Sequence, residues 1–153
     1  MKWSVLLLIF SVAAGVRAQT VDLDKTFRTL GFKVTGRTNV AAADWELRDF
    51  KMRSKRIFAL KSLKKVPGER NLYYRFAVRI EEYENEADAE RRIAEIEATP
   101  PGADSKLTAP EYDLREGFRR GTRVYVVSTN VYKFVADKSL SRFKSDLEKI
   151  VKE

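Results

Sequence analysis

Apolar and polar side chains alternate most regularly between residues 56 and 83, and this pattern predicts two strands. Residues 56–63 form the first strand and residues 72–83 the second. The segment between them contains Pro67-Gly68, a pair typical of turns, so we expect a hairpin. One face of the second strand packs on the core, and it carries only apolar side chains: Leu72, Tyr74, Phe76, Val78 and Ile80.

Apolar positions recur at the spacing of a helix over residues 85–98 and 138–152. The first helix begins after Asn85, which can cap it together with Asp88, and it ends before Pro100. The second helix has the cleaner apolar stripe, formed by Leu140, Phe143, Leu147, Ile150 and Val151.

Weaker patterns complete the chain. They indicate a short helix before Gly31, short strands at Phe32 and around Trp45, and strands over 117–120 and 123–134. Together these elements predict one α+β domain over residues 19–153. Its mainly antiparallel sheet has about five strands, with the two helices (about 85–98 and 138–152) packed on one face.

Residues 1–18 have the three parts of a cleavable signal peptide. Lys2 supplies the positive charge, residues 5–15 the apolar core, and Val16 and Ala18 the small residues of a cleavage site. Arg17 ends the apolar run before it reaches the roughly 20 residues that a membrane span requires. We therefore expect cleavage near Ala18 and no stable membrane span in the mature protein.

The chain contains no cysteine and no histidine. This composition excludes disulfides, thiolate and imidazole metal ligands, and nucleophilic catalysis that relies on cysteine or histidine. It also has no Asn-x-Ser/Thr acceptor for glycosylation. Because small secreted domains of eukaryotes usually carry disulfides or sugars, we expect a bacterial envelope protein, periplasmic or secreted, without a cofactor.

Charge is distributed unevenly along the chain, whose formal net charge is +8. Residues 51–65 contain only basic charges, whereas residues 81–97 are strongly acidic, and we expect the latter on a solvated helix face. The acidic stretch lacks the calcium-binding loop pattern. Four further arginines surround the turn at Gly121, where they are expected to keep a hairpin tip soluble: Arg115, Arg119, Arg120 and Arg123.

The basic run has two interpretations. If its side chains project with those of the partner strand, they form a cationic sheet face for phosphates or acidic glycans, beside the aromatic Tyr73. The candidate anion-binding residues are then Lys51, Arg53, Lys55, Arg75 and Arg79. Alternatively, the run is an edge strand that its charges protect from aggregation.

The sequence favours an exported, non-catalytic binding or accessory protein that contacts an anionic envelope component, or another protein, through the basic strand. Nucleic acid is an unexpected partner for an exported protein. A small hydrolase that uses two carboxylates is the alternative, and a cleft with two facing carboxylates would support it.

The export hypothesis has a direct test. We expect the mature protein to begin at or near Gln19, because Ala18 is the small residue that closes the signal. Mass spectrometry of the N-terminus of exported protein measures this, and an intact Met1 in the envelope fraction would contradict export by cleavage.

Overall fold

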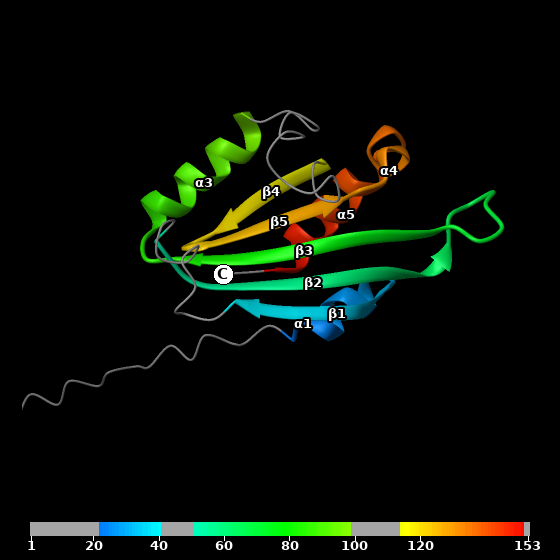
Figure 1. Cartoon of the computed structure of the whole chain (residues 1–153), viewed down its shortest axis with the longest axis horizontal. Coiled ribbons are helices and arrows are strands. Elements are labelled where there is room, and N and C mark those ends of the chain that lie inside the picture. The colour runs from blue at the N-terminus through cyan, green and yellow to red at the C-terminus, as the bar shows by residue number, and fades with distance from the viewer. Residues whose placement is uncertain (1–21, 41–50, 99–113, 152–153) are drawn as a thin grey trace, which may run out of the picture.

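The computed structural model describes residues 22–40, 51–98 and 114–151, which form a five-stranded antiparallel sheet with helices (Figure 1). The strand order is β1-β2-β3-β5-β4, and every neighbouring pair is antiparallel. The strands are β1 (Phe32–Val40), β2 (Met52–Lys65), β3 (Tyr73–Tyr83), β4 (Leu114–Arg120) and β5 (Arg123–Thr129). The helices are α1 (Leu23–Thr29), α3 (Glu86–Ala98), α4 (Tyr132–Ala136) and α5 (Ser139–Ile150). The predicted α+β class is therefore confirmed.

The hairpin of β2 and β3 is the central pair of the sheet. Its register sets Phe58 opposite Val78 and Leu60 opposite Phe76, so these side chains share one face, here called the inner face. The predicted hairpin is confirmed, and both of its strands begin or end within a few residues of the expected positions.

The inner face carries the main core, and α1, α4 and α5 cover it. Phe143 of α5 lies 4.7 Å from Phe32 and 5.0 Å from Phe76, measured between ring centroids. Leu140 and Leu147 of α5 are buried beside them. Of the apolar stripe predicted for the last helix, Leu140, Phe143, Leu147 and Val151 are buried as expected, whereas Ile150 is exposed.

The opposite face, here called the outer face, carries a second core under α3. Val124 and Val126 of β5 are buried there with Ala89 and Ile96 of α3. Gly117 of β4 makes this contact possible, because a Cβ atom at that position would lie 3.3 Å from the side chains of both Ile93 and Ile96.

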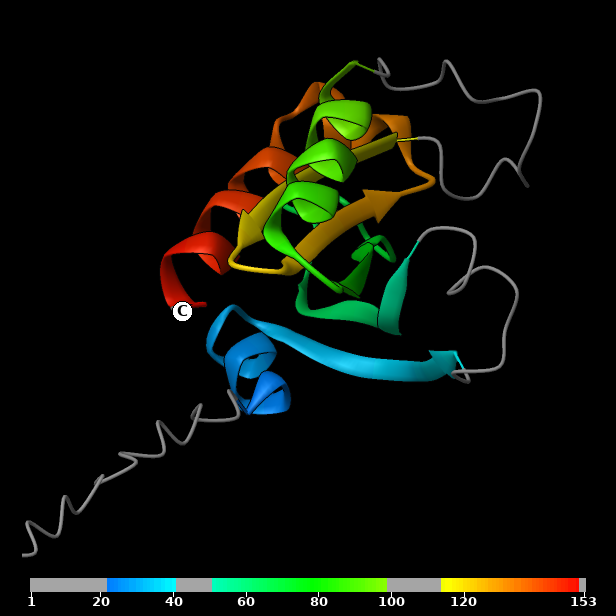
Figure 2. The ribbon, with the colours of Figure 1, turned by 90° about the vertical axis from the view of Figure 1, so that its left-hand side faces the viewer.

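The expectation that both predicted helices pack on one face is wrong. Helix α5 packs on the inner face and α3 on the outer face, with β4 and β5 between them (Figure 2). The physical reason is that β5 is apolar on both sides, with Val124 and Val126 facing α3 while Tyr125 and Val127 face the inner core.

The end of β5 also differs from expectation. Strand β5 ends at Thr129, and α4 occupies residues that the sequence assigned to the end of this strand. Lys138, with a φ of 60°, then redirects the chain into α5, and the Asp137 carboxylate accepts a hydrogen bond from the Ser139 amide. The strand expected around Trp45 lies outside the described residues.

Burial of the α5 stripe predicts a large loss on truncation. Phe143 is 5% exposed, so Phe143→Ala should lower the free energy of unfolding by about 3–5 kcal/mol. Urea unfolding measures the change, and Ser145→Ala on the exposed side of the same helix is the matched control. A loss below about 1 kcal/mol would show that α5 contributes little to the inner core.

Candidate functional site

A row of small side chains crosses the outer face where α3 does not cover it. Gly36 of β1 lies opposite Ala59 of β2, Ala59 opposite Ala77 of β3, and Ala77 opposite Ser128 of β5. Gly36 and Ala59 are exposed. The resulting hollow, here called the trough, has a volume of about 420 Å³ and is open to solvent.

The small residues of the trough are of types that occur infrequently in β-strands. Glycine and alanine are depleted in strands, where β-branched and aromatic side chains pack better. Gly36 does not have the positive φ that favours glycine, and a Cβ atom there would lie 3.6 Å from the Cβ of Ala59, an ordinary contact. The register of β1 and β2 shifts between Val34 and Gly36, so this glycine lies at an irregularity of the strand. Glycine within a strand marks either such a bulge or the close approach of a ligand.

Two basic side chains flank the trough at the hairpin end. Lys61 of β2 lies opposite Arg75 of β3, and both line the hollow. The Lys61 ammonium lies 4.1 Å from the centre of the Tyr73 ring, in cation–π geometry. Arg75 is exposed, and none of the residues lining the trough is acidic.

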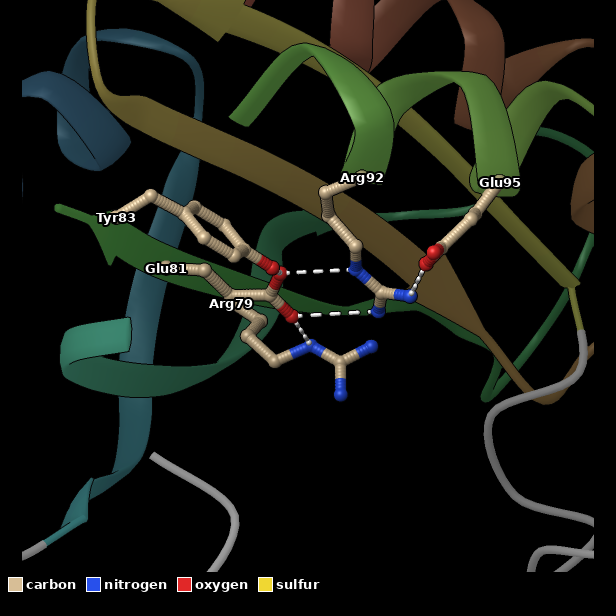
Figure 3. A network of polar contacts seen from close by, with 5 residues as sticks. All are labelled: Arg79, Glu81, Tyr83, Arg92 and Glu95. Carbon is tan, nitrogen blue, oxygen red and sulfur yellow. Dashed lines mark hydrogen bonds and ion pairs between the residues drawn. The ribbon is translucent and has the colours of Figure 1, made fainter. Parts of the chain in front are cut away.

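The other end of the outer face holds a buried ion network (Figure 3). The Glu81 carboxylate is 2% exposed and accepts hydrogen bonds from Nε and Nη2 of Arg92 on α3, at 2.9 and 3.3 Å. The Tyr83 hydroxyl donates to the same carboxylate at 2.8 Å, and Arg79 Nε lies 3.0 Å from it. Arg92 also pairs with Glu95 at 3.5 Å.

Burial and charge act in opposite directions on Glu81. Burial alone raises the pKa of its carboxyl, but the charges of Arg79 and Arg92, with hydrogen bonds from Arg92 and Tyr83, lower the pKa below its ordinary value. Burial and the neighbouring carboxylate raise the pKa of the Tyr83 hydroxyl, which therefore remains a hydrogen-bond donor.

The five basic residues proposed from the sequence do not form one exposed cluster. Lys55, Arg75 and Arg79 share the outer face, but Lys55 is only 6% exposed and Arg79 is engaged by Glu81. Lys51 lies in a turn with a φ of 55°. Arg53 is exposed where the register shifts, and its Nη2 donates to the Glu84 carbonyl at 3.4 Å.

The guarded-edge interpretation is also wrong, because β2 lies between β1 and β3. Its charges therefore project from the faces of the sheet rather than protect a free edge. Of the five candidates, Arg75 lies beside the trough with an exposed side chain and no ion pair to any described residue. Lys61 joins it there, a residue counted in the basic run but not placed in the candidate site.

The acidic residues 81–97 were expected on a solvated helix face, and two of them differ from this expectation. Glu81 and Asp88 are buried rather than solvated, and the Asn85 side chain accepts a hydrogen bond from the Asp88 amide as the predicted helix cap. Three of the four arginines near Gly121 form ion pairs. Arg119 pairs with Glu86, Arg120 with Glu148, and Arg123 with Glu82.

The described residues give little support to hydrolysis by paired carboxylates. Glu82 and Glu86 line a hollow of about 250 Å³ at the β4–β5 turn, but each is paired with an arginine of that turn. No group of three or more histidine, cysteine or acidic side chains within the described ranges could hold a metal ion.

Within the described part of the chain, no helix has the length and apolar character that a membrane-spanning helix requires. No protein-family model, curated protein or solved structure matches the sequence.

The buried network predicts a strong effect of neutralising Glu81. Glu81→Gln leaves the charges of Arg79 and Arg92 without their buried counter-ion, so it should lower the free energy of unfolding by about 3 kcal/mol. Glu95→Gln is the matched control, since Glu95 is exposed and should contribute less than about 1 kcal/mol.

The same pair of proteins gives a pH test. A carboxyl whose pKa is lowered by folding contributes stability above its ordinary pKa of 4.5, and this contribution is lost as pH falls through the lower folded value. The stability difference between the wild-type protein and Glu81→Gln should therefore shrink in acid. Urea unfolding at a series of pH values measures it, and a difference that stays constant below pH 4.5 would contradict the role of the charge.

Proposed function

We propose that this protein is an exported, non-catalytic binding module of the bacterial envelope that holds an extended anionic ligand in the trough. The observation that carries the proposal is the row of Gly36, Ala59, Ala77 and Ser128 across four strands. Gly36 and Ala59 are exposed, and the short side chains of Ala59, Ala77 and Ser128 line the hollow.

The trough suits a polymer better than a compact ion. It crosses the strands, so a chain lying in it meets successive strands of the sheet. Lys61 and Arg75 stand at one side, where they can contact anionic groups of the chain. Exposed charges of this kind attract a polyanion through a screened, long-range interaction rather than through one rigid pocket.

The proposed compartment rests on the signal-like residues 1–18 and on the absence of cysteine and of an Asn-x-Ser/Thr acceptor. Removal of residues 1–18 takes away Lys2 and Arg17 and no acidic residue, so the formal net charge falls from +8 to +6 in the mature protein. Anionic polymers are the partner chemistry that best complements this charge. The ligand class is therefore an acidic glycan or a phosphate-containing chain.

Filling the trough tests the proposal without removing any charge. Ala59→Leu places a larger side chain on an exposed strand position, so folding stability should change by less than about 0.5 kcal/mol. Binding to inorganic polyphosphate or dextran sulfate should weaken about tenfold or more, because the ligand can no longer approach the sheet. Calorimetric titration measures the affinity, with neutral dextran as the ligand control.

Reversing the two basic charges beside the trough tests whether they contact the anionic ligand. Lys61→Glu with Arg75→Glu should abolish binding, whereas Arg28→Glu with Arg70→Glu changes the net charge equally at exposed sites away from the trough. Wild-type affinity should also fall steeply between about 50 and 200 mM salt. Equal losses in the two double variants, with Ala59→Leu unaffected, would show non-specific attraction to a basic protein and would contradict a site in the trough.

A further inference from the structure

A second cleft lies on the inner face, between the start of β1, the end of β2 and α5, with a volume of about 570 Å³. Its floor is aromatic. The rings of Phe32, Phe76 and Phe143 have centroids 4.7 to 5.4 Å apart and are only 4–7% exposed. Tyr74 extends the same surface, with its ring stacked 6.1 Å from that of Phe76.

A bulge in β2 forms the mouth of this cleft. The register shifts between Lys61 and Lys65, which lifts the intervening residues out of regular pairing with β3. The Ser62 hydroxyl donates to the Lys64 carbonyl at 2.6 Å and accepts from the Tyr74 amide at 2.9 Å. These bonds satisfy backbone groups that the bulge would otherwise leave unpaired, so the bulge is a fixed feature of the fold.

The bulge places an apolar side chain at the opening. The Leu63 amide donates to the Gly31 carbonyl at 2.8 Å, which ties the bulge to the end of α1. The Leu63 side chain is nevertheless 56% exposed, and it lines the cleft together with Leu30. Apolar surface therefore continues from the aromatic floor to the mouth.

The charges at the mouth are mostly positive. Lys64, Lys65 and Arg142 line it, and none of them forms an ion pair with another described residue. Asp146 is the one acidic residue among the side chains lining the cleft, and it pairs with Lys149 at 2.9 Å. An anionic group at the mouth thus meets cations, while the interior offers apolar contact.

We propose that this cleft binds a single-chain amphiphile with a carboxylate head, of the medium-chain fatty acid class. The head would lie between Lys64, Lys65 and Arg142, and the alkyl tail along Leu63 and the aromatic floor. Pockets of about 300–1,000 Å³ hold small ligands of this kind. At roughly 30 Å³ for each methylene group, about the volume of a water molecule, a chain of twelve carbons with its head group needs less than the roughly 570 Å³ of the cleft and therefore fits in it.

The test is a calorimetric titration of the full-length mature protein with dodecanoate below its micelle concentration. Dodecanoate should bind at one site per chain. Hexanoate should bind at least about tenfold more weakly because it lacks half the apolar tail, and dodecyltrimethylammonium should bind at least about tenfold more weakly because its head is cationic.

Two variants at exposed positions separate the tail and head contacts without disturbing the core. Leu63→Asp should weaken dodecanoate binding at least about tenfold by placing a carboxylate in the apolar mouth, with an unchanged melting temperature. Lys64→Glu with Lys65→Glu should weaken it similarly, whereas Arg28→Glu with Arg70→Glu should not. Equal binding of dodecanoate and dodecyltrimethylammonium would overturn the proposal, as would wild-type affinity in Leu63→Asp.

A bilayer is the alternative occupant for an exposed leucine beside two lysines. Binding to vesicles of phosphatidylglycerol without binding to dodecanoate would overturn the cleft as a ligand site. The trough is tested separately, because Ala59→Leu should leave dodecanoate binding unchanged and Leu63→Asp should leave polyphosphate binding unchanged. Either proposal can therefore fail without the other.

Discussion

The ion pairs and hydrogen bonds of the buried Glu81 carboxylate hold α3 on the outer face of the sheet. The carboxylate is almost fully buried between β3 and α3, where removal from water is costly, and it is tolerated because two arginines and a tyrosine surround it. The apolar stripe of α3 is thin, with Ala89 and Ile96 as its buried apolar members. The bidentate contact of Arg92 therefore supplies the directional bond that sets how α3 lies on the sheet.

The position of α3 divides the outer face into two parts. Near Glu81, the helix covers Val124 and Val126 and closes the second core. Farther along the same strands, the side chains shrink to Gly36, Ala59 and Ala77, and the sheet is left open beside Arg75. The outer face therefore has one end that α3 covers and another end that is open to solvent and flanked by basic side chains. At the open end, three neighbouring strands carry glycine or alanine in place of the larger side chains that strands favour, and such departures often mark functional surfaces.

Much of the fold could be predicted because its signals are local. The alternation in residues 72–83, the Asn85 cap and the helical spacing of Leu140, Phe143 and Leu147 each depend on neighbours in sequence, and all three are confirmed. The placement of α3 could not be predicted, because it depends on which side of β5 is covered and on a pair between Glu81 and Arg92, eleven residues apart.

The candidate site was predicted only in part for a related reason. Counting charges located the basic strand, but burial of Lys55 and capture of Arg79 by Glu81 follow from tertiary contacts. The trough is formed by residues with small, uncharged side chains, and a search for clusters of charge does not find such residues. The signal that could have revealed it is the coincidence of Gly36, Ala59 and Ala77 within strands, which becomes a row only when the register of three strands is known.

The central claim is that an anionic chain lies in the trough, and amide chemical shifts test it most directly. In ¹H–¹⁵N NMR spectra of the protein titrated with polyphosphate, the account predicts that the largest shifts fall on Gly36, Ala59, Ala77 and Ser128. Shifts spread over exposed lysines and arginines of both faces, with these four amides unmoved, would contradict it.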